Sequence, residues 1–438
     1  MGALRSLLDR LPLLTTARRR SAAARAEDSS AALAAVYAAL DVGTEVAKAL
    51  VFEARDGEGV VTGAGRQRQG LADMQGGTIT NIRAVVANCD AALEQAERMA
   101  GMSPEQVVMG IAGELVRGGA TTVSVERSRP EQRLSRGELE KLVEQAQRQA
   151  LQQISSRLVW ETGLKRLDVR LVDAAIIEMK IDGHKVSDPI GFQGRHVEIT
   201  VFNAFAPLVH LGALQSVAGD LGLDLFAIVT EPYAVARCLA SPQAVELGAI
   251  FLDIGGGTTD VALVRNGGIE STRMFALGGR AFTKRLAQAL ELDFDQAEEL
   301  KLRYATGVLD DVKAKQVREV LEADTEVWRS GVELVLEELA GDEVLPPRFF
   351  LCGGGSQLPE IKEALESYPW QDRLPFARRP TVRLLQPRDV RAVRDATGQL
   401  RSQQDVTPLA LAYQAVELEQ EQDTLDDVLH TVIRWLRI

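Results

Sequence analysis

The chain has 438 residues, of which 46% are hydrophobic, 26% charged and 5% aromatic, and its formal net charge is −12. This length accommodates about two to four compact domains. No run approaches the ~18 to 20 uninterrupted apolar residues of a spanning helix, and an acidic chain with few aromatic residues is a poor nucleic-acid binder. Cys89, Cys238 and Cys352 are too scattered for a disulfide framework, which indicates a reducing cytoplasm. We therefore expect a cytoplasmic protein with no nucleic-acid partner.

Residues 1–35 form a basic N-terminal arm and linker. The first 26 residues hold six arginines against one acid, Asp9. Leu4, Leu7, Leu8 and Leu11 would share one helix face, so a surface-seeking arm and an unstructured basic tail are both open interpretations. Asp9 and Arg10 interrupt the apolar run, which argues against a secretory signal.

From residue 36 the pattern is that of an α/β protein, with short apolar runs between glycine turns. Residues 36–40 and 49–52 predict two strands joined by a tight turn at 41–44. Residues 82–99 predict a helix, and residues 107–112 and 123–125 predict further strands.

Residues 134–153 predict a charged amphipathic helix. Ser135 and Glu138 have the spacing of a capping box at its start. Two alternating stretches, 172–179 and 196–206, follow across turn-rich sequence and predict a strand pair. We interpret this segment as a small α+β module inserted into a larger fold.

The strongest motif is the sequence IFLDIGGGTTDVALV at residues 250–264. An apolar strand ends in Asp253, a turn follows, and a second apolar strand runs back. Successive glycines can adopt positive φ and have no Cβ, so the N–H groups of this turn could close around phosphate oxygens. The carboxylate at the strand end could hold Mg²⁺ through water. The residues of this turn are Gly255, Gly256, Gly257, Thr258 and Thr259. An ordinary glycine hairpin is the alternative.

A second copy of this arrangement begins at Asp41. Gly43 and Thr44 form its turn, and Lys48 lies near the start of the returning strand. Two such hairpins, 253 − 41 = 212 positions apart, predict a fold of two similar halves that grip one triphosphate. A third glycine cluster follows the apolar residues 349–352 and precedes a helix expected near Pro359. It comprises Gly353, Gly354, Gly355 and Ser356, and its backbone could approach a base or ribose.

In order and separation, these three loops resemble the phosphate-1, phosphate-2 and adenosine motifs of the actin, sugar kinase and DnaK-type chaperone superfamily. The resemblance implies an α/β, actin-like fold: two ribonuclease-H-like domains around a nucleotide cleft that holds Mg-ATP. Glu231, in the sequence TEPYAVA, would orient the attacking water as a catalytic residue beside Asp253. Asp41 and Asp253 would be the magnesium carboxylates. Gly278 and Gly279 are similar to the glycine pair beside the nucleotide, with Lys284 on the helix that follows.

Within that superfamily the chain resembles FtsA, the bacterial cell-division actin, over about residues 36–418. The turn at 187–192 (SDPIGF) is similar to one in FtsA's inserted subdomain IC. Residues 297–301 (AEELK) are similar to the FtsA stretch in which Glu298 and Lys301 would reach the ribose and base. An exposed acid–base pair on a helix is the alternative for these two residues.

The C-terminus ends in the same way as FtsA. After an acidic linker, residues 425–438 predict an amphipathic helix that could lie at a lipid surface. Its apolar face would comprise Leu425, Val428, Leu429, Val432, Trp435 and Leu436. Packing of this helix on the protein's own core is the alternative. One such helix binds weakly, so attachment would favour polymers.

The resemblance implies the following division: subdomain IA at 36–107 and again at 207–245, inserted subdomain IC at 108–206, IIA at 246–280, a short IIB at 281–345, IIA with the closing helix at 346–415, a linker at 416–424, and the membrane helix at 425–438.

The implied function is that of an FtsA-like protein that binds Mg-ATP, forms filaments with itself and tethers the division machinery to the cytoplasmic face of the membrane. The FtsZ-like tubulin homologue would be its partner, although IIB, where FtsA meets FtsZ, is shorter here. A PilM-like scaffold for pilus or secretion assembly is the alternative. A sugar kinase is less favoured, and a chaperone is disfavoured because no peptide-binding domain follows. Turnover is expected to be slow at most, and whether ATP is hydrolysed stays open.

Overall fold

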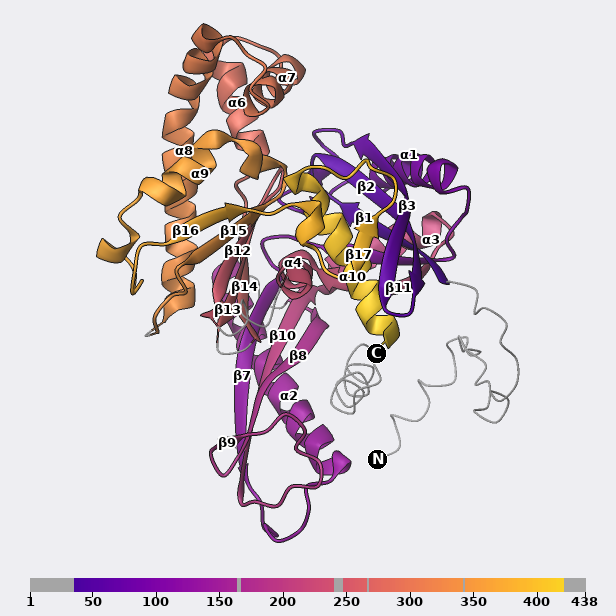
Figure 1. Cartoon of the computed structure of the whole chain (residues 1–438), viewed down its shortest axis with the longest axis vertical. Helices are drawn as coiled ribbons and strands as arrows, with labels where there is room; N and C mark the ends of the chain where they lie inside the picture. Colours follow the sequence, from indigo (N-terminus) through magenta and orange to yellow (C-terminus); the bar gives the residue numbers. More distant parts are fainter. Residues whose placement is uncertain (1–34, 164–166, 240–246, 266–267, 342, 421–438) are drawn as a thin grey trace. The chain divides into compact units, whose positions relative to one another are not determined.

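The computed structural model describes residues 35–163, 167–239, 247–265, 268–341 and 343–420. The predicted basic arm, apart from Ala35, and the predicted membrane helix lie outside these residues. In the described part, helices cover two large mixed sheets (Figure 1). No helix in it is both long and apolar enough to cross a membrane.

The first sheet is built on a three-stranded meander, β1 (Ala35–Val42), β2 (Val46–Arg55) and β3 (Glu58–Arg68). Strands β6 (Gln106–Ile111) and β11 (Asp224–Thr230) extend it in parallel to β1, and β17 (Val393–Asp395) pairs with β3. Alternate residues of β1 enter different cores: Ala38 and Leu40 pack with α1 (Ile82–Ala100) and α3 (Leu208–Asp220). Tyr37 and Ala39 pack with α4 (Glu231–Leu239) and α10 (Val406–Gln420). Both faces are therefore buried, which explains the apolar strands.

The second sheet repeats this topology. Strands β12 (Ala249–Ile254), β13 (Thr259–Arg265) and β14 (Gly268–Phe275) form the meander, and β15 (Arg348–Cys352) and β16 (Thr381–Leu384) run parallel to β12. Its separate core is shared with α6 (Gly279–Ala289), α7 (Phe294–Ala305), α8 (Asp311–Ala340) and α9 (Pro359–Ser367). The core that holds α4 and α10 contains residues of both sheets. These two helices thus lie where the halves meet, as in an actin-like fold.

The predicted inserted module contains β7 (Arg117–Glu126), α2 (Arg136–Thr162), β8 (Val169–Ile181), β9 (His184–Lys185) and β10 (His196–Pro207). The capping box of Ser135 and Glu138 is confirmed, but α2 runs nine residues beyond the predicted end at Gln153. Ile154 and Leu158 continue its apolar spacing, and Gly163 ends it with a φ of 66°. β7 pairs with β14, so the strands of this module continue the second sheet.

Residues 279–341, all of them described, contain no strand, and only residues 306–310 separate α7 from α8. The link between these two helices is therefore short, and the assignment of this segment to a short subdomain IIB stays a prediction. The remaining elements are the hairpin β4 (Met74–Gln75) and β5 (Thr78–Ile79), and the 3₁₀ turns η1 (Gly354–Gln357), η2 (Trp370–Asp372), η3 (Pro387–Asp389) and η4 (Gln403–Asp405).

Candidate nucleotide-binding site

The two predicted phosphate loops, one from each half, contact each other. A Cβ added to Gly257 would lie 2.9 Å from the side chain of Thr44, and one on Gly256 would lie 2.7 Å from the Cβ of Glu45. Glycine is therefore required at positions 256 and 257, because the two loops lie too close together to leave room for a Cβ. The positive φ that we considered for this turn is not used, because none of the three glycines at 255–257 has one. The sequence analysis thus explained these glycines by the missing Cβ, which the structure supports, and by positive φ, which it does not.

Asp41 and Asp253 lie at the ends of equivalent strands and are both buried. The Lys48 ammonium is 2.7 Å from Asp41 Oδ2, and the charges of Asp253 and Glu231 also act on it. Although burial alone would lower the pKa of Lys48, these carboxylates, Asp41 foremost, raise it above the usual range. The structure therefore brings together four predicted residues from both halves of the fold.

Burial also acts on the acids around this lysine. It raises the pKa of Glu231 well above its usual range, and the charges of Asp41, Asp260 and Asp253 add to that effect. Burial likewise raises the pKa of Asp253, although the Thr407 hydroxyl donates a hydrogen bond to its Oδ2 and favours the ionised form. The pKa of Asp260 is raised by burial and then by Asp253, which lies opposite it in the strand pair.

This cluster fits a divalent cation. Four buried carboxylates, those of Asp41, Glu231, Asp253 and Asp260, act on one another, and Oδ1 of Asp260 has no hydrogen-bond partner among the described residues. Such an excess of buried negative charge is costly unless it is protonated or neutralised. Across the described ranges, no three acidic, histidine or cysteine side chains are grouped to ligate a metal directly. The acid cluster is therefore compatible with a cation held through water, and its identity as magnesium stays a prediction.

The predicted adenosine-side residues adjoin the second phosphate loop. The N–H of Gly279 donates to the carbonyl of Gly255 at 2.8 Å. The Lys301 ammonium donates to the Gly279 carbonyl at 3.1 Å and lies 2.7 Å from Glu298 Oε2. Both charged side chains are buried, so the alternative of a solvated helix pair is wrong.

The third glycine loop lies against the carboxylate of Asp253. Gly353 has a φ of 79°, and a Cβ there would lie 2.2 Å from Asp253 Oδ1. Gly355 packs on Ile254, and Ser356 is buried with its hydroxyl donating to the Gly353 carbonyl at 2.7 Å. Gly354 has open space around it, with Gln404 as its nearest neighbour. The three loops thus adjoin one another as predicted.

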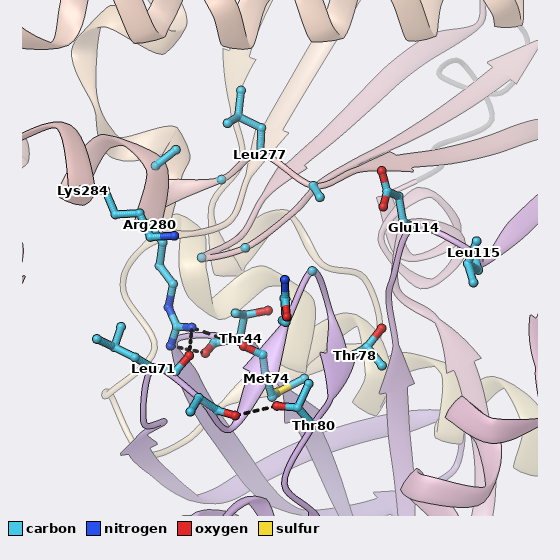
Figure 2. Close-up of a pocket in the computed structure, with 18 of the residues that line it drawn as sticks. Thr44, Leu71, Met74, Thr78, Thr80, Glu114, Leu115, Leu277, Arg280 and Lys284 are labelled. Carbon is cyan, nitrogen blue, oxygen red and sulfur yellow. Dashed lines mark hydrogen bonds between the residues drawn. The ribbon is translucent and has the colours of Figure 1, made fainter. Parts of the chain in front are cut away.

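A cavity of about 790 Å³ borders the phosphate loops (Figure 2). The predicted residues that line it are Thr44, Gly256, Gly257, Gly278 and Lys284. Apolar side chains, including Leu71, Met74 and Leu277, form much of the remaining wall. Thr259 has a structural role instead: its hydroxyl donates to the Leu277 carbonyl at 2.7 Å and accepts from the Trp328 indole at 2.9 Å.

Sequence reasoning missed three residues of this region. Asp260 could have been found from the sequence, because it is an acid near the start of a mostly apolar strand. Arg280 directly follows the glycine pair in the sequence, but its partners in the other half could not be predicted from that position. Thr407 carries no local signal, since it is one threonine in an apolar helix.

The repeated sheet topology and the shared acid cluster define an actin-like protein with a candidate nucleotide cleft between its halves. The comparisons agree with that class. The model of the family described as "Cell division protein FtsA" matches residues 250–404. Among the solved structures, a chain of the "PilM-PilN type IV pilus biogenesis complex" covers 87% of this chain and 98% of its own length, with a TM-score of 0.62 and 18% identity. That match shows the fold.

Curated relatives agree with the family match. FtsA of Pseudomonas aeruginosa is 25% identical over 77% of this chain and 82% of its own length. FtsA of Bacillus subtilis is 26% identical over 74% of this chain and 75% of its own length. The protein is FtsA-like, as the sequence motifs indicate.

Proposed function

We propose that the protein binds Mg-ATP between its two halves and uses it as a switch for self-assembly in cell division. The observation that carries this proposal is the meeting of Asp41 and Asp253, one from each half, beside Lys48. A site shared in this way couples ligand binding to domain closure, because each half supplies only part of it.

Each residue has a distinct role in this proposal. Lys48 and the loop N–H groups bind the phosphates, and Asp41 and Asp253 hold the hydrated cation. Glu298 and Lys301 bind the ribose and base, and the third loop packs beside the ribose and base. Bound Mg²⁺ would neutralise phosphate charge. Glu231 orients a water molecule within a slow turnover, and because burial raises its pKa, its ionised form is a stronger proton acceptor than an exposed carboxylate.

The similarity to FtsA relatives supports the proposed cellular role. The protein forms filaments, contacts an FtsZ-like tubulin homologue or other division proteins, and is held at the cytoplasmic face of the membrane by the predicted helix at 425–438. That helix lies outside the described residues, and the support for this step is its sequence pattern. Many weak anchors on one filament bind a membrane far more tightly than one anchor does.

Liposome sedimentation tests the membrane role. We expect the full chain with Mg-ATP to sediment with anionic vesicles, and a chain ending at Gln422 to stay in the supernatant. Equal sedimentation of the two proteins would contradict the proposal that residues 425–438 attach the protein to a membrane. Electron microscopy on a lipid monolayer with ATP adds the test of polymerisation, for which filaments are expected.

A PilM-like assembly scaffold is the second candidate. The strand-free segment at 279–341 favours it, since FtsA proteins carry extra strands in subdomain IIB, where they meet FtsZ. Binding to purified FtsZ from the same organism separates the two. We expect saturable binding; no FtsZ binding and no vesicle binding together would favour the scaffold.

A further inference from the structure

One arginine contacts both phosphate loops. The backbone N–H of Arg280, in the first turn of α6, donates to the carbonyl of Gly256 at 2.8 Å. Its guanidinium crosses to the other half, where Nη2 donates to the carbonyl of Thr44 at 2.7 Å. Figure 2 shows this side chain extending from its helix toward Thr44 and Leu71.

The same guanidinium is ion-paired with Glu45, the residue after Thr44. Arg280 Nε lies 2.6 Å from Glu45 Oε2, and the two side chains are only 10% and 17% exposed. Two weaker bonds, to the carbonyls of Leu71 at 3.4 Å and Met74 at 3.5 Å, hold the segment that leads into the β4–β5 hairpin. Because a planar guanidinium supplies several donors in fixed directions, lysine could not make this set of contacts.

A second ion pair continues the connection outward. Arg68, in the first half, lies 2.8 Å from Glu45 Oε1 and 2.8 Å from Asp295 Oδ1 in α7 of the second half. Arg68 is 45% exposed and Asp295 is 80% exposed, so this outer pair is weak and sensitive to salt. The buried Arg280–Glu45 pair is the main contact, and the outer pair supports it.

We propose that Arg280 and Glu45 form a latch that positions the two phosphate loops and limits the rate at which the cleft opens. This inference rests on the proposed nucleotide site and adds its regulation. Opening the halves must separate a buried, multiply bonded ion pair, so the latch slows both entry and release of nucleotide. Arg280 is thus a positioning residue, and it need not touch the nucleotide.

Stopped-flow fluorescence with an N-methylanthraniloyl ATP analogue and Mg²⁺ tests the latch in the full chain. For Glu45→Gln we expect release about tenfold faster or more, with association accelerated as well, so that Kd changes by less than about threefold. Arg280→Lys should release faster too. Release within about twofold of wild type in Glu45→Gln would overturn the latch.

The matched control lies on the same helix. Arg285 pairs with Asp324 within one half, at 2.7 Å, and Arg285→Gln should leave release unchanged. If Arg285→Gln accelerates release as much as Glu45→Gln does, general loosening of α6 explains the result and the latch is wrong. Higher salt should accelerate release from the wild type more than from Glu45→Gln.

A second measurement does not depend on nucleotide. The described cysteines are all buried, so spin labels can be placed at introduced cysteines on exposed positions, Arg83 of α1 and Gln316 of α8. Without nucleotide, Glu45→Gln should lengthen or broaden the measured distance between them. An unchanged distribution would overturn the latch, whereas a wild type that binds no ATP would instead reject the proposed function.

Discussion

The hydroxyl of Thr407 donates a hydrogen bond to the carboxylate of Asp253, and this bond joins the two halves of the fold at the candidate metal site. Asp253 ends β12 of the second sheet, whereas Thr407 lies in the first turn of α10, which packs on the first sheet. In its last turns, α10 carries Glu417, which is 2.8 Å from Arg237 of α4. Glu231 begins that same α4, so α10 contacts the strand and the helix that carry the two proposed catalytic acids.

Replacement of Thr407 should therefore affect cation-dependent binding. Thr407→Val keeps the volume but removes the donor, so Asp253 loses a bond that favours its ionised form. We expect Mg-ATP affinity to fall about five- to thirtyfold, the effect of roughly 1–2 kcal/mol. Thr407→Ser keeps the hydroxyl donor and should therefore retain most of the Mg-ATP affinity. Isothermal titration calorimetry measures both, and equal losses in the two variants would assign Thr407 a packing role only.

Lys48→Met tests the role of the Lys48 ammonium group inside the acid cluster. Removing it leaves Asp41 and its neighbours without a positive partner, so we expect the free energy of unfolding to fall by about 3–5 kcal/mol without nucleotide. Urea denaturation measures this loss. The exposed pair of Lys185 and Glu178 gives the control, since Lys185→Met should cost less than about 1 kcal/mol. Comparable losses in the two variants would contradict the cluster.

The raised pKa of Glu231 predicts a pH dependence. Between its usual value of 4.5 and the raised pKa, the folded protein binds more protons at this carboxyl than the unfolded chain does. The free energy of unfolding without nucleotide should therefore fall as pH rises through that window. Glu231→Gln removes this titration. It should reduce the slope of the pH profile, to which the raised pKa values of Asp253 and Asp260 also contribute, and stabilise the protein at pH 8 by about 1–3 kcal/mol.

Chemical denaturation across pH measures this effect, with the exposed Glu337 of α8 as control. Glu337→Gln should follow the wild-type profile. A Glu231→Gln profile parallel to that of the wild type would show that this carboxyl does not carry the dependence.

Two adjacent glycines make a matched pair in the third loop. Gly353→Ala places a Cβ against Asp253 at a φ of 79°, whereas Gly354→Ala meets nothing closer than 4.0 Å. We expect Gly353→Ala to lower the free energy of unfolding by about 1–3 kcal/mol and to weaken Mg-ATP binding. Gly354→Ala should resemble wild type in thermal unfolding. A tolerated alanine at 353 would contradict the close packing of this loop on Asp253.

The sequence was informative where function depends on local pattern. Each phosphate hairpin combines an apolar strand, a terminal acid and glycines in one short segment, so β1, β2, β12 and β13 could be located and paired. The topology of each half follows from the order of such segments. The end of α2 was predicted nine residues too early, although Gly163 is a typical helix C-cap.

Contacts between distant segments could not be predicted in this way. The bond from Thr407 to Asp253 spans 154 positions, and the pair of Arg280 and Glu45 spans 235. Neither depends on periodicity, since each is set by how the halves pack. The pairing of β7 with β14 is likewise a tertiary event that strand propensity does not encode.

The most direct test of the shared site is a double-mutant cycle by calorimetry with Mg-ATP. Asp41→Asn and Asp253→Asn should each weaken binding by about tenfold or more, and the double variant should lose far less than the product of the two effects, because both act on one ligand. Additive losses would indicate separate sites, and wild-type affinity in either single variant would contradict a nucleotide held by both halves.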